Sequence, residues 1–345
     1  MKVRVTKVDY LRCVHCTEMG RQVSDNYTLD GNVFTPEKIL GGGAFGTAYL
    51  ASRNDNPNDK YVLKRIVFFQ NNADPATQNQ VAVKLVAQWR KALTFHHVNL
   101  VRYFHAKEHD NEFIPTQKEG ILILEFCEMG NLEAYLANKR QQNVTPPLPL
   151  VAVKSCVHDI LQGLSYLHAD ENKVAHTDLK PANILLTVRD GVIVTKIADI
   201  DDHVAIIATM TRSEVKDTRG TERYQSPEIL QAKYDLLRVG RKTDIWSVGV
   251  IVVELGRGSL PFKLIKMDGV RPVRTDYMIV EQRSLPMQVR DFIVQNGVPD
   301  IPQTEILKGF TKLEQCFKRS GMDRPKAVEL LQDPWFKGGP WQWRA

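Results

Sequence analysis

The sequence predicts an α+β fold with two lobes, a small β-rich N-terminal lobe followed by a larger and mainly α-helical lobe. Strand patterns dominate residues 34–126, whereas after Gly130 apolar side chains recur at helical spacing. The 345 residues are 43% hydrophobic and 25% charged, which is ordinary for a globular protein. The longest apolar runs stop far short of the roughly 20 residues that span a bilayer, so we expect no membrane segment.

Strands and one helix are expected in the first lobe. Short runs of residues with β propensity are separated by turns rich in glycine and asparagine. One longer stretch has apolar residues at helical spacing. The predicted elements are, in chain order, two strands around a glycine cluster within 39–51, a strand at 61–66, a helix at 80–95, and strands at 100–105 and 121–126.

The second lobe is expected to be built on helices. Apolar residues within 157–167 predict an amphipathic helix, introduced by a proline-rich segment at 145–149. The pair Asp190-Gly191 predicts the turn of a β-hairpin. Residues 244–255 are apolar on nearly every face, which predicts a helix through the middle of the lobe.

Charge and cysteine content exclude several classes of protein. A net charge of +6, from 46 Lys and Arg against 40 Asp and Glu, favours a solvated surface, and we expect no nucleic-acid partner. Five cysteines, an odd number, favour reduced thiols, and Cys13 and Cys16 lack a second ligand pair for zinc. No signal peptide is evident, so we expect a cytoplasmic or a nuclear protein.

The segment from His176 to Asn183 places a carboxylate, an ammonium and an amide at fixed offsets on one loop. This set suits phosphoryl transfer. Asp178 would accept or orient the proton of an attacking hydroxyl, Lys180 would neutralise charge on the phosphate, and Asn183 would hold a magnesium ion. The segment resembles the catalytic loop of eukaryotic protein kinases, with Thr177 where an arginine is usual.

Other segments resemble the same family, and they follow its order along the chain. They are a glycine-rich motif at Gly41, Gly43 and Gly46, a strand lysine at Lys64, a hinge at 124–132, a metal-binding segment at 196–201, the end of an activation loop at 220–228, a buried helix at 244–249 and a closing segment at 331–336. Any one motif is weak, but their order identifies the chain as a member of this family. The resemblance implies a kinase domain over 34–338, with an N-lobe at 34–126, a hinge at 125–131 and a C-lobe at 132–338. Residues 1–33 would form an N-terminal extension of unknown role and 339–345 a C-terminal tail.

The resemblance also implies an ATP site with a divalent metal, Mg²⁺ or alternatively Mn²⁺. The three glycines would lie over the phosphates and Lys64 would pair with the α and β phosphates. Asp199 would bind the metal together with Asn183. The remaining nucleotide contacts that the resemblance implies are Ala48, the main chain of Glu125 and Cys127, Asn131 at the ribose, and Leu185.

The acceptor is expected to be a serine or threonine of a protein substrate. Thr221, together with Lys180, points to serine/threonine rather than tyrosine acceptors, and the segment 220–228 argues against a small-molecule kinase. The resemblance further implies that Asp244 braces the catalytic loop and that Arg324 pairs with Glu228. Regulatory partners are not identified by the sequence.

Two departures from the family pattern keep an alternative open. Gln88 stands where a glutamate normally pairs with the strand lysine, and Asp201 stands where the metal-binding segment normally has glycine. A neutral partner gives Lys64 a weaker hydrogen bond than a carboxylate would. The alternative is therefore a pseudokinase, a protein that binds nucleotide and acts as a scaffold or an allosteric partner.

Overall fold

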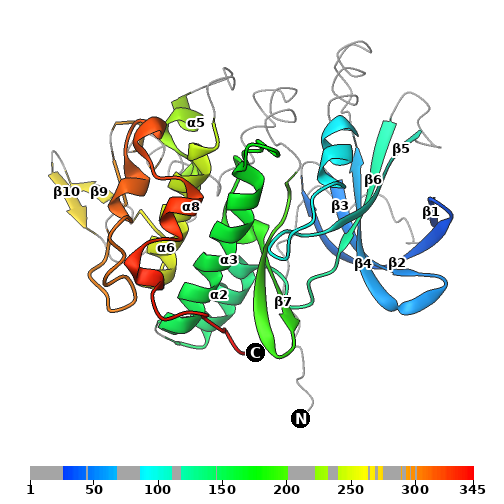
Figure 1. The fold of residues 1–345 in the computed structure, drawn as a ribbon, viewed down its shortest axis with the longest axis horizontal. Coiled ribbons are helices and arrows are strands. Elements are labelled where there is room, and N and C mark those ends of the chain that lie inside the picture. Colours follow the sequence, from blue (N-terminus) through cyan, green and yellow to red (C-terminus); the bar gives the residue numbers. More distant parts are fainter. Residues whose placement is uncertain are drawn as a thin grey trace. The chain divides into compact units, whose positions relative to one another are not determined.

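A six-stranded antiparallel sheet forms the N-terminal part of the chain in the computed structural model (Figure 1). Its strands lie in the order β1-β2-β3-β4-β6-β5, and each neighbouring pair is antiparallel. The bounds are β1 (Tyr27–Leu29), β2 (Asn32–Gly43), β3 (Gly46–Arg53), β4 (Asn56–Val67), β5 (Tyr103–Asp110) and β6 (Lys118–Glu125).

The structure divides the chain into two units, which are described one at a time. The first contains Met1–Phe95 and Arg102–Phe126, and the second contains His96–Val101 and Cys127–Ala345. The residues that the structure describes are 26–43, 46–67, 86–110, 118–144, 146–200, 222–231, 240–262, 265–268, 271–274, 289, 293–295, 297–299 and 301–345.

A buried apolar cluster of the first unit lies on one face of the sheet. Alternate residues of the strands point to the same face, so the apolar positions of several strands meet there. The buried cluster consists of Leu29, Phe34, Ala51, Leu63, Ile121 and Ile123. Because Leu29 on β1 is only 2% exposed, the sheet and its core begin before residue 34, where the domain was expected to start.

The predicted strand at 100–105 was wrong at its start. The strand β5 begins at Tyr103 instead. The Val101 N–H donates to the Ile197 carbonyl, and the Ile197 N–H donates to the Asn99 carbonyl, both at 2.9 Å. These hydrogen bonds occupy the backbone just before Tyr103 within the second unit. Of the helix predicted at 80–95, residues 86–92 are helical and 80–85 lie outside the described residues.

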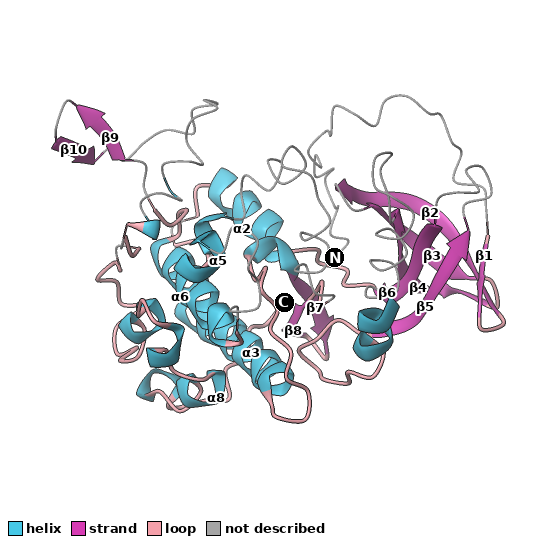
Figure 2. Cartoon of the chain, turned by 90° about the horizontal axis from the view of Figure 1, so that it is seen from above, coloured by secondary structure: helices cyan, strands magenta, loops and turns pink. Residues whose placement is uncertain are grey.

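Helices dominate the second unit (Figure 2). The long helix α3 packs against α6, α8 and β8. Every residue of α6 from Thr243 to Gly256 is buried, which confirms the helix predicted at 244–255. The helices are α2 (Leu132–Gln141), α3 (Leu150–His168), α5 (Pro227–Gln231), α6 (Lys242–Arg257) and α8 (Ala327–Leu330), with short 3-10 turns at Pro181–Asn183, Glu222–Tyr224, Glu314–Phe317, Gly321–Asp323 and Pro334–Phe336.

Two hairpins accompany these helices. The first joins β7 (Ile184–Arg189) to β8 (Val192–Ile197) through Asp190 and Gly191, whose φ angles of 52° and 75° fit the predicted tight turn. The second joins β9 (Ile265–Asp268) to β10 (Arg271–Arg274), within a stretch for which no structure was predicted.

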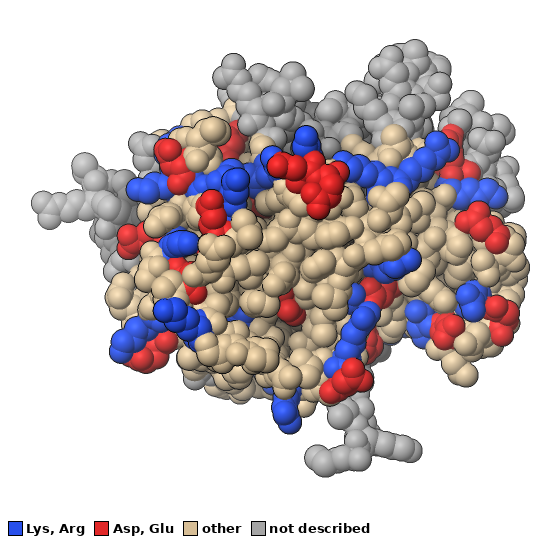
Figure 3. Space-filling model, in the orientation of Figure 1, with Lys and Arg blue, Asp and Glu red and all other residues tan. Residues whose placement is uncertain are grey.

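The charged side chains are mixed in sign on the face that Figure 3 shows, where lysine and arginine alternate with aspartate and glutamate. A mixed surface agrees with the modest net charge of the sequence. Among the described residues, no helix has the length and apolar character that a membrane crossing requires.

Candidate active site

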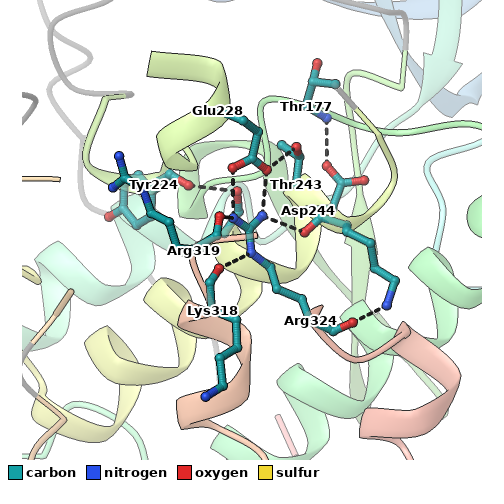
Figure 4. Close-up of polar contacts among 10 residues, drawn as sticks. Thr177, Tyr224, Glu228, Thr243, Asp244, Lys318, Arg319 and Arg324 are labelled. Atoms are coloured by element: carbon teal, nitrogen blue, oxygen red, sulfur yellow. Dashed lines mark hydrogen bonds and ion pairs between the residues drawn. The ribbon is translucent and has the colours of Figure 1, made fainter. Parts of the chain in front are cut away.

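Asp244 holds the catalytic loop from below (Figure 4). This α6 carboxylate is fully buried and accepts the backbone N–H groups of His176 and Thr177, each at 2.8 Å. Its Oδ2 atom also lies 2.8 Å from Nε2 of His168. Burial opposes ionisation of the carboxyl, but the hydrogen bonds and the charges of His168 and His176 outweigh it and lower the pKa of Asp244. The predicted role of Asp244 as a brace is therefore confirmed.

The loop adopts a strained conformation at the residue that Asp244 holds. Thr177 has a φ of 65°, in the left-handed region that a β-branched residue rarely adopts. Such a residue costs on the order of 1–3 kcal/mol and persists where its surroundings fix it, often at functional sites. The two hydrogen bonds to Asp244 supply that constraint immediately before Asp178.

The loop also fixes the residue before Asp199. The Ala198 N–H donates to the Asn183 carbonyl at 2.9 Å, and the Ala198 carbonyl lies 2.7 Å from Nε2 of His176. Both backbone groups of Ala198 are therefore tied to the segment 176–183. As a result, Asp199, with a φ of 54°, follows a residue anchored beside the catalytic loop.

The three predicted catalytic-loop side chains meet one another. The Asn183 amide nitrogen donates to the Asp178 backbone carbonyl at 2.9 Å and to its carboxylate Oδ2 at 3.0 Å. The Lys180 ammonium lies 2.7 Å from the same Oδ2. Asp178 is only 5% exposed, so the interactions of its carboxylate with the amide and the ammonium act in a region with little water to screen them.

The residues present suit a magnesium ion. Magnesium takes oxygen ligands and commonly uses one or two carboxylates together with substrate phosphates and water. Because its nitrogen donates to Asp178, the Asn183 amide keeps its oxygen available as a ligand, and Asp199 offers a carboxylate. In the described part of the chain no group of three or more histidine, cysteine, aspartate or glutamate side chains forms a metal cage.

In the first unit, three predicted nucleotide contacts lie in one row across the sheet. Gly41 on β2 pairs with Ala48 on β3, and Ala48 pairs with Lys64 on β4. Directly opposite residues of antiparallel strands project from the same face of a sheet. The register therefore places the Lys64 side chain on the same face as Ala48, beside the glycine-rich turn.

Gly46 is required for the approach of β3 to β4. Its φ is 150°, and a Cβ atom at this position would lie 1.9 Å from the Arg65 carbonyl oxygen. Any side chain would therefore displace the strand. Gly43 is the last residue of β2 and pairs with Gly46, whereas a Cβ atom at Gly41 would meet nothing within 4 Å.

In the second unit, two further predicted contacts adjoin one another. Asn131 and Leu185 form an isolated antiparallel bridge. Asn131 also begins α2 as its N-cap, because its Oδ1 atom accepts the Ala134 N–H at 2.8 Å. The predicted ribose contact thus has a structural task as well, one that a single sequence position does not reveal.

The hinge residues are held by local hydrogen bonds. The Glu125 N–H donates to the Arg102 carbonyl at 2.9 Å, and the Glu125 carboxylate accepts the Arg102 N–H at 3.1 Å. The Cys127 thiol is reduced and buried, and the Cys127 carbonyl accepts the Gly130 N–H at 3.1 Å. The main-chain contacts of Glu125 and Cys127 with a nucleotide stay a prediction.

Arg324 and Glu228 form the ion pair that the resemblance implied. The guanidinium is bidentate to the carboxylate, at 2.6 and 2.8 Å, and it also donates to the Lys318 and Arg319 carbonyls (Figure 4). Burial opposes ionisation of Glu228, but the hydrogen bond and the charge of Arg324 outweigh it and lower the pKa of Glu228.

Sequence reasoning missed the polar partners of two helical acids in the second unit. Glu254 on α6 is 2% exposed and accepts from the Tyr224 hydroxyl at 2.6 Å and from Arg140 at 2.8 Å. Asp159 on α3 accepts the Thr195 N–H at 2.8 Å. A charged residue inside an otherwise apolar helical run was the signal for both, because such a charge needs a partner when it is buried.

Several predicted positions lie outside the described residues. They are Thr221 of the predicted catalytic set, Asp201 of the metal-binding segment, and Cys13 and Cys16. Gln88, the other departure from the family pattern, lies half-buried in the helical stretch 86–92.

Comparison with known families agrees with this geometry. The family model for the protein kinase domain matches residues 34–336, which is most of the chain. The chain belongs to the protein kinase domain family. The expected two-lobed kinase fold, with a β-rich N-lobe and a helical C-lobe, is thereby confirmed.

Relatives of this kinase domain are similar over most of its length. They include mitogen-activated protein kinase kinase kinase A of Dictyostelium discoideum, 27% identical over 86% of the chain, and MAP kinase kinase kinase wis4 of Schizosaccharomyces pombe, 28% identical over 85%. MAP3K epsilon protein kinase 1 of Brassica napus is 29% identical over 92% of the chain. The chain spans only 27%, 19% and 21% of the lengths of these relatives.

Proposed function

We propose that this kinase domain transfers the γ-phosphate of ATP to serine or threonine hydroxyls of a protein substrate. The supporting observation is the double anchoring of Ala198, whose N–H is bound by Asn183 and whose carbonyl contacts His176. This anchoring sets the expected metal ligand, Asp199, beside the loop that carries Asp178. Both belong to the machinery that phosphoryl transfer requires.

Each charged group of the loop has a task in this reaction. Asp178 would orient the acceptor hydroxyl and take its proton while the hydroxyl oxygen bonds to the γ-phosphorus. The bond between that phosphorus and the bridging oxygen breaks, and ADP leaves. Lys180, now 2.7 Å from the Asp178 carboxylate, would offset negative charge on the transferred group.

Asn183 and Asp199 would hold the divalent ion. A bound Mg²⁺, or Mn²⁺ in its place, supplies positive charge that offsets the charge of the phosphates. The ladder between β7 and β8, which pairs Ile184 with Ile197, ends directly beside both residues. This short ladder would keep the amide oxygen and the carboxylate at one edge of the hairpin.

The names of the relatives suggest an acceptor protein. The similar proteins of Dictyostelium and Schizosaccharomyces are named as kinases of a MAP kinase kinase. We therefore propose a MAP kinase kinase as the first acceptor to be tested. The scaffold alternative rests on Gln88 and Asp201 and is not favoured over catalysis by these relatives.

The test is transfer of labelled γ-phosphate from ATP, with magnesium and then with manganese, to this acceptor and to a generic basic protein. Asp178→Asn should abolish transfer and leave ATP binding nearly intact, because the change removes a proton acceptor and little volume. Asp190→Asn in the exposed hairpin turn is the matched control and should transfer normally. Binding of ATP without transfer by the wild type would favour the scaffold instead.

A further inference from the structure

The last residues of the second unit lie beyond the end of the family match and contact the β7–β8 hairpin. The protein kinase domain model ends at residue 336, yet residues 338–345, here called the strap, run back beside the hairpin of β7 and β8 (Figure 1). Nothing in the family pattern predicts a contact there.

The strap extends the hairpin as a further strand segment. The Ile193 N–H donates to the Trp343 carbonyl at 2.6 Å, and the Ala345 N–H donates to the Gly191 carbonyl at 3.2 Å. Between them, Arg344 forms an antiparallel bridge with Val192. Backbone pairing with the strap therefore covers the start of the outer edge of β8, where unpaired backbone groups would otherwise be exposed.

Two tryptophans attach the strap to helices. Trp343 is 5% exposed, and its ring meets that of Tyr135 on α2 edge to face, with the centroids 5.3 Å apart. The Lys154 ammonium of α3 lies 4.2 Å from the centroid of Trp341. Buried aromatic rings contribute large apolar contacts, so Trp343 is the main anchor and Trp341 adds a cation–π contact.

The anchor joins the two elements that carry predicted nucleotide contacts. Tyr135 lies one turn after Asn131, which caps α2, and β8 is paired with the strand that holds Leu185. Asn131 and Leu185 themselves form a bridge. Trp343 contacts Tyr135 through its ring and Ile193 through its carbonyl. It therefore gives α2 and the hairpin a second connection beside this bridge.

We infer that Trp343 is a positioning residue for nucleotide binding, acting through α2 and the β7–β8 hairpin. The inference rests on the proposed function because it takes Asn131 and Leu185 as nucleotide contacts. Loss of the anchor would remove one of the links between α2 and the hairpin and would weaken ATP binding, while the catalytic loop stays braced by Asp244.

The experiment compares Trp343→Ala, Trp343→Phe and Gln342→Ala in the full chain. Trp343→Ala should weaken magnesium-ATP binding, measured by titration calorimetry, by about three- to tenfold, the usual size of coupling between linked positions. The KM for ATP should rise in step while kcat stays within about twofold, the pattern of lost binding shared by ground and transition states. Trp343→Phe should restore most of the affinity, and Gln342→Ala, an exposed position, should change nothing.

Amide hydrogen exchange reports whether the strap has been released. The Ile193 N–H should exchange faster in Trp343→Ala, whereas the Ala198 N–H, bound to Asn183, should not. Ala345→Pro removes the donor to Gly191 and keeps Trp343, so it serves as a milder variant if Trp343→Ala fails to fold. Faster exchange at Ile193 with an unchanged ATP affinity overturns the inference. A wild type that binds ATP without transferring phosphate counts against the proposed function alone.

Discussion

Asp244 is completely buried and has three polar partners. Its removal should therefore lower the stability of the fold strongly. Asp244→Ala leaves the N–H groups of His176 and Thr177 and the ring of His168 without their acceptor. Breaking a buried charged network of this kind costs about 3–5 kcal/mol. We expect a loss of that size in urea unfolding, together with loss of phosphate transfer. Asp323→Ala, at an exposed position, should change stability by less than about 0.5 kcal/mol.

A loss below about 1 kcal/mol for Asp244→Ala would mean that the loop is held by other contacts. The candidate would then be His176, which binds Ala198 independently of the carboxylate.

Arg324 illustrates why charge alone does not define a position. Its guanidinium is bidentate to Glu228, donates to three carbonyls and lies 5.3 Å from the Trp246 ring centroid. Lysine keeps the charge but cannot reproduce the planar fork. Arg324→Lys should therefore lower the free energy of unfolding by about 2–4 kcal/mol, because several buried acceptors lose a donor. Arg90→Lys, at an exposed helical position, is the control, and equal effects at both sites would contradict the argument.

Among the elements, the contact of α3 with β8 carries a titratable group. Burial raises the pKa of Asp159 from 3.8 to about 6, and the Thr195 N–H, Asn99 and Lys196 offset part of this rise. The folded protein therefore binds a proton near pH 5 that the unfolded chain releases. Ionised Asp159 destabilises the fold above pH 6, and this penalty disappears as the pH falls from 6 to 4.

Asp159→Asn removes the charge and keeps an acceptor for Thr195. We expect it to raise the free energy of unfolding at pH 7 by up to about 3 kcal/mol, and the gain should shrink toward zero below pH 5. Urea unfolding at pH 7, 5 and 4 measures this difference from the wild type. Asp170→Asn, whose side chain is 89% exposed, should give a curve parallel to the wild type. Parallel curves for Asp159→Asn as well would refute the assignment.

Elements whose signals are local were predictable from sequence, and those that depend on distant partners were not. The turn at Asp190-Gly191 needs left-handed residues, and α6 is apolar on all faces, so both were predicted. The start of β5 depends on hydrogen bonds between Val101 and Ile197, which no local pattern encodes. The strap was expected only as a tail, because two tryptophans in a short segment do not say which strand edge they cover.

Across both units, some residues of the candidate site were predictable from the sequence and others were not. The family resemblance predicted the roles of Asp244 and Arg324 because each belongs to a family pattern with a fixed partner. The buried partners of Asp159 and Glu254 could not be predicted, because burial of a charge is decided by packing between helices. Lys64, on the sheet of the first unit, and Asp178, on the loop of the second, can be related only through the reaction they serve.

The shared role of Lys64 and Asp178 in one reaction predicts that the effects of changing them on kcat are not additive. Lys64→Met and Asp178→Asn should each lower kcat for phosphate transfer by at least about a hundredfold, since each removes a charged group from one transition state. When two groups act as a unit, removing either one already removes most of their joint contribution to the rate. The double variant should therefore have nearly the same kcat as the slower single variant. Lys60→Met, on the same strand but exposed, should transfer normally. A double loss equal to the product of the single losses would instead mean that the two units contribute independently.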